Sequence, residues 1–461
     1  MRAAVAQILP SLTGARLVNA GDVVFNGVST DSRSVSAGAL FVALRGEVFD
    51  AHNFLSEVAG KGVAAVVVEE LPEGWTLPAI VVPNTLVALG QIANWWRKQF
   101  SMPVIGVTGS NGKTTVKEMI SAILAAAYGD EGRLATRGNL NNEIGVPLTL
   151  FRMNAQQQAA VIEMGMNHQG EIGRLAAIAG ANIAMVNNAQ REHQEFMHTV
   201  EAVARENGAV LSALPTDGVA VFPFGDEFTG IWEELSAGRR MLRFGLTKNA
   251  EVSCTFRASD FESEMFVTIC ESEADPRQFF VRLQAAGEHN VRNALAAVAC
   301  TYAAGVPLEK IKLGLDTFAP VSGRLQKKQA GNGAVVIDDT YNANPDSVRA
   351  AIDVLSKAAV PRVLVLGDMG EVGTQGREFH EEVGAYAQDK GIETVLVTGE
   401  LAAFMKGANI RHFENFGDLL SAVDAAVSPD ATVLIKGSRF MKMERVVQHL
   451  IGSQQANKEG H

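Results

Sequence analysis

The segment that most constrains the fold of this chain is residues 104–115, which read Val-Ile-Gly-Val-Thr-Gly-Ser-Asn-Gly-Lys-Thr-Thr. An apolar run predicts a buried strand, a glycine-rich turn follows it, and the next residues have the apolar spacing of an amphipathic helix. In this order the N–H groups of the turn and the helix N-terminus can surround an anion. The segment therefore predicts phosphate binding by Gly109, Ser110, Asn111, Gly112, Lys113, Thr114 and Thr115.

The motif departs from the strict phosphate-loop pattern at one position. That pattern requires glycine where Val107 stands, and the additional glycine lies one residue earlier, at Gly106. A tight strand–helix turn is the alternative interpretation, since glycine favours such turns. We favour phosphate binding because all parts occur in order. The Lys113 ammonium can neutralise phosphate charge, and the Thr114 hydroxyl can ligate Mg²⁺.

Length, charge and cysteine content exclude several protein classes. A chain of 461 residues predicts about three domains of roughly 150 residues each. An apolar fraction of 47% is typical of a soluble protein, and no run reaches the ~18 apolar residues of a membrane span. Residues 1–10 fit a short amphipathic helix better than a signal peptide. The net charge of −11, without a basic cluster, argues against nucleic acid. Three scattered cysteines indicate a reducing compartment, and we expect a cytoplasmic protein: Cys254, Cys270 and Cys300.

The order of apolar runs predicts three blocks. The first carries short strand-like runs and a helix that ends near Phe100. In the second, strands and helices alternate to about residue 210, followed by a β-like insert over 250–283 and an alanine-rich helix over 290–304. The third has four strand-like runs, each ending in a polar or glycine-rich tip where ligands bind in open parallel sheets. We predict an α/β fold of three domains: a small α/β N-terminal domain (1–100), a central P-loop domain with a parallel sheet (101–320) and a C-terminal Rossmann-like domain (321–461).

Two residues at predicted strand ends are candidates for metal binding. Glu163 ends the apolar run 159–163, where its carboxylate would meet a Mg²⁺ held by Thr114. His193 follows the run 183–186 and is a candidate for a second metal or phosphate contact. The alternatives are a solvated carboxylate for the first residue and a structural histidine for the second.

Taken together, the motifs resemble the Mur ligase family over nearly the whole chain. They are residues 108–115, the Gly-Asn-Leu-Asn-Asn of 138–142, Glu163 with His168, His193, the segment 287–297, Ser-Gly-Arg-Leu at 322–325 and 338–347. The last motif, with 366–371 and 436–439, is similar to the branch that adds D-alanyl-D-alanine, as are residues 29–33 and 41–54. The branch that adds the third residue usually carries Asp-Asn-Pro-Arg, which this chain lacks.

The resemblance implies a reaction, its cofactors and its partners. ATP, with Mg²⁺, would phosphorylate the terminal carboxylate of a UDP-N-acetylmuramoyl tripeptide, and the amine of D-alanyl-D-alanine would attack the acyl phosphate. The central domain would act as the ATPase, the first domain would bind the UDP substrate, and the third would complete the ligase. We expect a monomer whose domains close to exclude water during the reaction.

The resemblance also implies roles for individual residues. Lys113, His193 and Arg324 would be catalytic. Thr114 and Glu163 would hold the first Mg²⁺, and His193 a second. Asn290 and Asn293 would face adenine, with helix capping as the alternative, and Arg324 and Asp339 would contact the nucleotide. The remaining candidates are substrate-binding, with exposed turns as the alternative: Thr30, Asp31, Ser32 and Arg33 for the UDP part, Arg45 near the pyrophosphate, Asn139, Asn141 and Asn142, and Tyr341, Asn342, Asn344 and Ser347 for the dipeptide or the tripeptide tail.

One position departs from the family pattern. Many Mur ligases carry a lysine on the helix after the histidine segment, and its carbamate helps to hold the second Mg²⁺. Here no lysine occurs between Lys117 and Lys248, and the spacing from His193 places Asn207 at that position. An amide oxygen is a weaker, neutral ligand. Our hypothesis is that the second metal is bound less tightly, or with Glu206 or additional water.

Two other classes of function stay open on the sequence. The first is another Mur ligase branch that adds a single amino acid, or a folylpolyglutamate-type ligase, because both share the phosphate loop and carboxyl activation. The second is a nucleotide-dependent binding or regulatory module without ligation. The sequence does not distinguish meso-diaminopimelate from lysine in the tripeptide.

Overall fold

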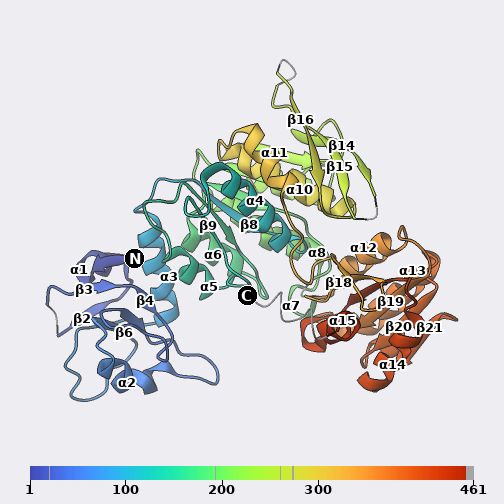
Figure 1. Cartoon of the computed structure of the whole chain (residues 1–461). Coiled ribbons are helices and arrows are strands. Elements are labelled where there is room, and N and C mark those ends of the chain that lie inside the picture. The colour runs from blue at the N-terminus through green and yellow to red at the C-terminus, as the bar shows by residue number, and fades with distance from the viewer. Residues whose placement is uncertain (20, 193, 260, 273–274, 453–461) are drawn as a thin grey trace.

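The computed structural model describes residues 1–461 except 20, 193, 260, 273–274 and 453–461. Three parts follow one another along the chain, and Figure 1 shows the N-terminal part and the C-terminal part on opposite sides of a central one. Each part is built on its own main sheet. The predicted α/β fold class is confirmed, whereas the domain limits drawn near residues 100 and 320 stay a prediction. Within the described residues, no helix has both the length and the apolar character needed to cross a bilayer.

The N-terminal part has a five-stranded sheet in the order β2-β7-β6-β5-β4. The first 10 residues were expected to form a helix, but a strand, β1, precedes the four-residue α1 and pairs with β3. The predicted terminal helix is present as α3, whose apolar face packs on the sheet core. The elements are β1 (Arg2–Ala4), α1 (Val5–Ile8), β2 (Arg16–Val18), β3 (Val24–Asn26), β4 (Val28–Ser29), β5 (Leu40–Val42), α2 (Leu55–Gly60), β6 (Ala65–Val68), β7 (Ala79–Val81) and α3 (Thr85–Arg97).

The central part has a nine-stranded sheet in the order β16-β15-β14-β13-β12-β11-β8-β10-β9. The strand of the phosphate loop, β8, lies between β11 and β10 and is parallel to both, so the carboxyl ends of three strands meet beside the loop. The β-like insert is confirmed as three strands that pair antiparallel at one edge of this sheet. The strands are β8 (Val104–Thr108), β9 (Arg133–Ala135), β10 (Ala159–Glu163), β11 (Ile183–Val186), β12 (Val219–Pro223), β13 (Arg240–Gly245), β14 (Val252–Ala258), β15 (Ser263–Ile269) and β16 (Arg277–Leu283).

Helices cover both faces of the central sheet. The apolar stripes of α4 and α10 share one core with the sheet, and those of α6 and α8 share another with α3 of the N-terminal part. This packing fixes the N-terminus of α4 at the end of β8, as the sequence predicted. The helices are α4 (Lys113–Tyr128), α5 (Gly145–Leu150), α6 (Glu171–Ala179), α7 (Gln194–Met197), α8 (Val200–Ser212), α9 (Thr229–Leu235), α10 (Glu288–Ala303) and α11 (Leu308–Asp316).

The C-terminal part has a six-stranded sheet in the order β17-β18-β22-β19-β20-β21, parallel except for β17. The four predicted strands are confirmed as β18, β19, β20 and β22, and the polar edge strands β17 and β21 were not predicted. The elements are β17 (Gln326–Gln329), β18 (Val335–Asp339), α12 (Pro345–Leu355), β19 (Arg362–Gly367), α13 (Gly376–Asp389), β20 (Thr394–Thr398), β21 (Ile410–Phe413), α14 (Phe416–Ala426), β22 (Thr432–Lys436) and α15 (Glu444–Ile451).

Candidate functional site

A large pocket of about 1360 Å³ lies where the central and C-terminal parts meet. Its lining comes from the phosphate loop, the carboxyl end of β10, the first turn of α10 and the loops after β18, β19 and β22. The predicted residues that line it are Ser110, Asn111, Gly112, Lys113, Thr114, Thr115, Asn139, Asn141, Asn142, Glu163, Asn290, Asn293, Arg324, Asp339, Tyr341, Asn342, Asn344 and Ser347.

Two glycines allow the phosphate loop to pack tightly against its neighbours. Gly109 has φ +134°, and a Cβ there would lie 2.9 Å from the backbone nitrogen of Asn187. Gly112 has φ +80°, and its Cβ would lie 2.5 Å from the amide of Asn293. Both conformations are ones that L side chains rarely adopt. The loop therefore needs these two glycines whether or not it binds phosphate.

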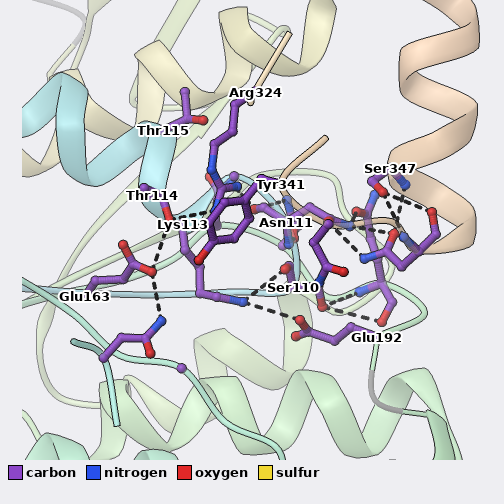
Figure 2. Close-up of a pocket in the computed structure, with 18 of the residues that line it drawn as sticks. Ser110, Asn111, Lys113, Thr114, Thr115, Glu163, Glu192, Arg324, Tyr341 and Ser347 are labelled. Carbon is purple, nitrogen blue, oxygen red and sulfur yellow. Dashed lines mark hydrogen bonds and ion pairs between the residues drawn. The ribbon is translucent and has the colours of Figure 1, made fainter. Parts of the chain in front are cut away.

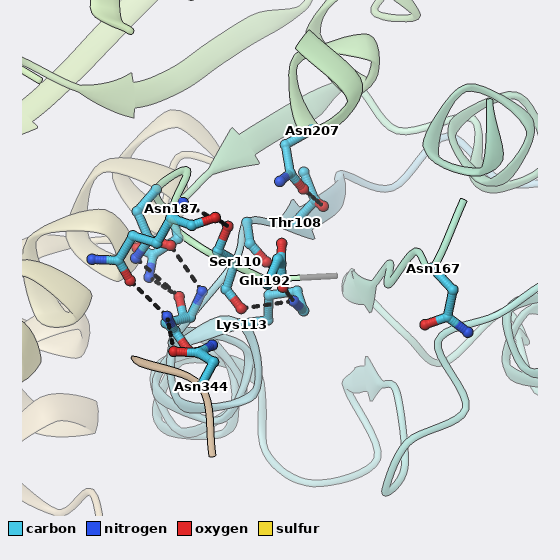
Figure 3. Close-up of polar contacts among 12 residues, drawn as sticks. Thr108, Ser110, Lys113, Asn167, Asn187, Glu192, Asn207 and Asn344 are labelled. Carbon is cyan, nitrogen blue, oxygen red and sulfur yellow. Dashed lines mark hydrogen bonds and ion pairs between the residues drawn. The ribbon is translucent and has the colours of Figure 1, made fainter. Parts of the chain in front are cut away.

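A belt of side-chain amides after β11 holds the phosphate loop in place (Figure 3). Asn188 Oδ1 accepts from the Asn111 backbone N–H at 2.8 Å, and Asn187 Nδ2 donates to the Asn111 carbonyl at 2.7 Å. Gln190 Oε1 accepts from Asn111 Nδ2 at 2.6 Å, and the Gln190 N–H donates to Ser110 Oγ at 2.8 Å. These bonds fix the phosphate loop against the segment after β11.

The Lys113 side chain folds back over its own loop. Its Nζ donates to the carbonyls of Gly109 and Ser110, the second at 3.0 Å, and lies 3.3 Å from Glu192 Oε2 (Figure 2). Glu192 is 7% exposed and lines the same pocket. A nucleotide phosphate that bonds to the Lys113 ammonium would take the place of one or more of these contacts.

Thr114 and Glu163 lie together, as the metal hypothesis requires. The Thr114 hydroxyl donates to Glu163 Oε1 at 3.1 Å, and Asn141 Nδ2 donates to the same oxygen at 2.9 Å (Figure 2). Glu163 is 2% exposed, and its Oε2 has no hydrogen-bond partner among the residues that the structure describes. A buried carboxylate oxygen without a partner is costly unless a cation neutralises it. The hydroxyl and carboxylate oxygens are hard donors, so this pair fits Mg²⁺.

The described residues contain no cluster of three or more histidine, cysteine or acidic side chains that could hold a metal alone. A metal at Thr114 and Glu163 would therefore complete its coordination with phosphate and water oxygens, as Mg²⁺ commonly does. His193, predicted as a catalytic residue and second metal ligand, lies outside the described residues.

Asn290 and Asn293 do not cap a helix, so that alternative is wrong. The helix α10 starts at Glu288, two residues earlier than the sequence suggested, and Gly287 is its N-cap. Asn290 Nδ2 donates to the Ala286 carbonyl at 2.8 Å, and Asn293 joins Asn290 to Asn187 through bonds of 3.1 and 2.8 Å. Both side chains are buried at the pocket wall, and Asn293 connects them to Asn187 of the amide belt.

Arg324 connects the C-terminal part to the phosphate loop. Its Nη2 donates to Thr114 Oγ1 at 3.0 Å, and its guanidinium lies 4.2 Å from the centre of the Tyr341 ring (Figure 2). Asp339 lies deeper, 2.7 Å from Lys436 Nζ. Burial raises the pKa of Asp339, and the charge of Lys436 acts in the opposite direction. These two residues place one cation and one paired carboxylate beside the loop.

Residues 341–347 lead into α12 and reach the phosphate loop directly. Asn344 is the N-cap, and its Oδ1 accepts from the Ser347 N–H at 2.8 Å. The amides of Asn344 and Asn111 also bond to each other in both directions, at 3.0 and 3.3 Å. The turn interpretation and the functional one thus both fit Asn344, because it caps the helix and faces the phosphate loop.

Asn207, which we expected at the position of the family's lysine, bonds to the sheet and does not line the pocket. Its Oδ1 accepts from Thr108 Oγ1 at 2.5 Å, its Nδ2 has no hydrogen-bond partner in the described part of the chain, and the residue is 1% exposed. Figure 3 draws this pair apart from the contacts around Lys113. Glu206 accepts from the N–H groups of Gly170 and Ile172 at 2.8 Å each. Both carboxylate oxygens of Glu206 are therefore engaged at the start of α6.

The five predicted residues of the N-terminal part do not line this pocket. Arg33 bonds to Asp31 at 2.9 Å and lowers the pKa of Asp31 to about 2. Ser32 is buried, and Thr30 is half-buried beside it. Arg45 bonds to the three carboxylates of Asp50, Glu69 and Glu70, at 2.8, 3.2 and 2.6 Å. Binding of the UDP part at these residues stays a prediction.

Five residues after β11 contact the site and were not predicted from the sequence: Asn187, Asn188, Gln190, Arg191 and Glu192. The sequence carried a signal for them, because the polar run 187–193 follows an apolar strand. Only the histidine of this run was chosen as a candidate site residue. Arg191 reaches Asp346 and Glu382 of the C-terminal part at 2.6 and 2.7 Å. No local pattern predicts a contact between residues so far apart in the chain.

Comparison with family models gives three matches in chain order. Residues 24–97 match the Mur ligase family catalytic domain, residues 107–301 the Mur ligase middle domain, and residues 323–439 the Mur ligase glutamate ligase domain. Together these segments cover most of the chain and contain the lining of the pocket except Val321 and Ser322.

Individual relatives agree with the family models. The chain is 37% identical over 433 residues to the UDP-N-acetylmuramoyl-tripeptide–D-alanyl-D-alanine ligase of Escherichia coli, covering 93% of this chain and 94% of the relative. It resembles a crystal structure of MurF from Acinetobacter baumannii with a TM-score of 0.91 and 33% identity, covering 98% and 99%. A MurF ligase from Thermotoga maritima in complex with ADP has a TM-score of 0.84 and 25% identity, covering 95% and 100%.

Proposed function

The chain belongs to the Mur ligase family, and we infer that it ligates D-alanyl-D-alanine to a UDP-N-acetylmuramoyl tripeptide with hydrolysis of ATP to ADP and phosphate. The relatives described above, which are ligases of this specificity, support this activity over the addition of a single amino acid or a folylpolyglutamate-type reaction. They also argue against a binding module without catalysis. We place the reaction in the cytoplasmic synthesis of peptidoglycan precursors.

The observation that carries the proposal is the meeting of the phosphate loop and the 341–347 segment in one pocket. The amides of Asn111 and Asn344 bond directly across it. A phosphoryl group on the loop and an amine on the segment would then lie within one pocket, as ligation requires.

The chemistry has two steps. A carboxylate oxygen of the tripeptide attacks the γ-phosphorus of ATP, the bond to the bridging oxygen breaks, and ADP leaves. The amine of the dipeptide then attacks the acyl carbon, loses a proton, and inorganic phosphate leaves. Both steps bring anionic or electron-rich groups together, so Lys113 and Arg324 would stabilise the charge that develops on the phosphoryl oxygens. When bound at Thr114 and Glu163, Mg²⁺ would supply further charge neutralisation.

Asn141 would keep the Glu163 carboxylate in place, because it donates to one oxygen and leaves the other for the metal. Asn290 and Asn293 would present amide edges to adenine from the wall of the pocket. We assign the N-terminal residues Thr30–Arg33 and Arg45 to the UDP part on the family resemblance alone.

Mass spectrometry of the product tests the proposal. Incubation with ATP, a UDP-N-acetylmuramoyl tripeptide and D-alanyl-D-alanine should add the mass of the dipeptide minus one water, with one phosphate released. Parallel reactions with free D-alanine, L-lysine or glutamate should give no product. A mass gain with a free amino acid but not with the dipeptide would overturn the proposal.

Asn207 gives this ligase a distinguishing property that can be measured separately. Because neither Asn207 nor Glu206 can carry a carbamate, we expect activity to be the same in bicarbonate-depleted buffer and after added bicarbonate. A strong rise with bicarbonate, together with a carbon dioxide adduct in the segment 194–212, would contradict this.

A further inference from the structure

We propose that Arg191 is a positioning residue for the ligation step, because it holds the 341–347 segment and α12 against the phosphate loop. The inference rests on the proposed function for its kinetic test, and on the contacts between the two parts for its structural test. Arg191 does not line the pocket, so it would act through the residues that do.

Arg191 forms several bonds to the carboxylate of Asp346 at the start of α12. Its Nη2 lies 2.6 Å from Asp346 Oδ1, its Nε lies 3.2 Å from each oxygen, and its backbone N–H donates to Oδ2 at 2.9 Å. Asp346 directly precedes Ser347 and lies two residues after the N-cap Asn344. The planar guanidinium thus fixes both the position and the orientation of this turn.

The same guanidinium also bonds to α13. Its Nη1 donates to Glu382 Oε2 at 2.7 Å and its Nη2 to Oε1 at 3.1 Å, while the group lies 5.2 Å from the centre of the Phe379 ring. Burial alone would lower the pKa of Arg191, but the bonds to the two carboxylates raise it above its ordinary value. Arg191 also leads the causes that hold the pKa of Glu382 below its ordinary value.

The neighbours of Arg191 in the chain connect its bonds with α12 and α13 to the phosphate loop. The preceding residue, Gln190, bonds to Asn111 and Ser110 of the phosphate loop. The following residue, Glu192, lies beside Lys113. Two consecutive residues therefore hold the two sides of the pocket: Gln190 holds the loop, and Arg191 holds α12. A short rigid link of this kind fixes the distance between a phosphoryl group and the segment expected to receive the amine.

Arg349 provides a matched control. It is also an arginine bonded to Glu382, at 2.6 Å, and it lies 4.2 Å from the Tyr386 ring. Arg349 lies on α12 and both partners lie on α13, so these contacts stay within the C-terminal part. Loss of Arg349 removes a similar charge and a similar ring contact without releasing the central part.

The kinetic experiment compares Arg191→Ala, Arg191→Lys, Asp346→Asn and Arg349→Ala. We expect Arg191→Ala to raise KM for D-alanyl-D-alanine about tenfold and lower kcat, with the Kd of ATP changed less than twofold. Arg191→Lys should be intermediate, because a lysine keeps the charge but not the fork. The double variant Arg191→Ala/Asp346→Asn should be no worse than the more severe single variant. Arg349→Ala should match the wild type.

The structural experiment does not depend on the substrate. Small-angle scattering with ADP bound should give a larger radius of gyration for Arg191→Ala than for the wild type and for Arg349→Ala. The three proteins should have equal melting temperatures, so that unfolding does not account for the larger radius. Asp346→Asn serves the same purpose if Arg191→Ala does not fold. Unchanged dipeptide kinetics together with an unchanged radius would overturn the proposal. If the wild type fails to ligate the dipeptide, the proposed function fails, and the radius alone decides the role of Arg191.

Discussion

The two walls of the pocket are held in place in different ways. The central wall, made by the phosphate loop, Glu163 and the start of α10, is stabilised by hydrogen bonds within one part of the molecule. The C-terminal wall, made by Arg324 and residues 341–347, reaches the first through a few long-range contacts. We therefore expect nucleotide binding to survive loss of the contacts between the two walls, and ligation to be lost.

The largest effect is expected on the central wall. Lys113→Ala removes the charge next to the expected phosphate, so kcat should fall by about a thousandfold. The fold should remain, because the polar partners of Lys113 among the described residues are two loop carbonyls and Glu192. Phosphate release measures the rate, and Lys98→Ala, an exposed lysine at the end of α3, is the control. If the variant keeps a tenth of the activity, Lys113 does not take part in the chemical steps.

Glu163→Gln tests the metal site on the same wall. It keeps the shape of the side chain but removes the charge that faces Thr114, so the affinity for Mg²⁺ in the presence of ADP should fall at least about tenfold. Calorimetric titration of Mg²⁺ measures this directly. Glu143→Gln is the control, since Glu143 also lines the pocket but bonds to Arg174 at 2.7 Å. Equal Mg²⁺ affinities in both variants would place the metal elsewhere.

Asn344→Ala tests the contact between the walls with a smaller effect. Loss of the N-cap should destabilise α12 by about 1 kcal/mol. Loss of the bonds to Asn111 should in addition raise KM for D-alanyl-D-alanine roughly threefold to tenfold. Asn415→Ala removes an equivalent cap on α14, far from the pocket, and should affect only the melting temperature. If both variants behave alike, the contact with Asn111 does not contribute to ligation.

The same contrast explains what the sequence could predict. Lys113, Thr114 and Glu163 lie at the ends of apolar strands or in a turn with strict backbone needs, so periodicity and glycine placement located them. The bonds of Arg191 to Asp346 and Glu382 join residues 155 and 191 positions apart, and no periodic pattern carries that information. The polar strands β17 and β21 were missed because edge strands lack the apolar run used to find the others.

The smallest effect is expected on the pKa of His289. This residue lines the pocket on the central wall, and its pKa depends on charged groups of the C-terminal wall. Desolvation, and then the charge of Lys436, lower the pKa of His289 to about 4, while Asp353 and Glu288 act in the opposite direction. Lys436 and Asp353 belong to the C-terminal part.

The sign of the pH dependence follows from the depressed pKa of His289. The unfolded chain binds a proton at His289 near pH 6.5 and the folded protein near pH 4, so this residue lowers stability as the pH falls between those values, by roughly 1 to 3 kcal/mol. Separation of the walls would expose the imidazole to water and move Lys436 away, and both changes raise the pKa of His289. NMR titration of labelled histidine should therefore show a higher pKa of His289 in Arg191→Ala than in the wild type, and no change in Arg349→Ala. The same value in all three proteins would mean that the walls stay together without Arg191, and that the central wall is less independent than its hydrogen bonds indicate.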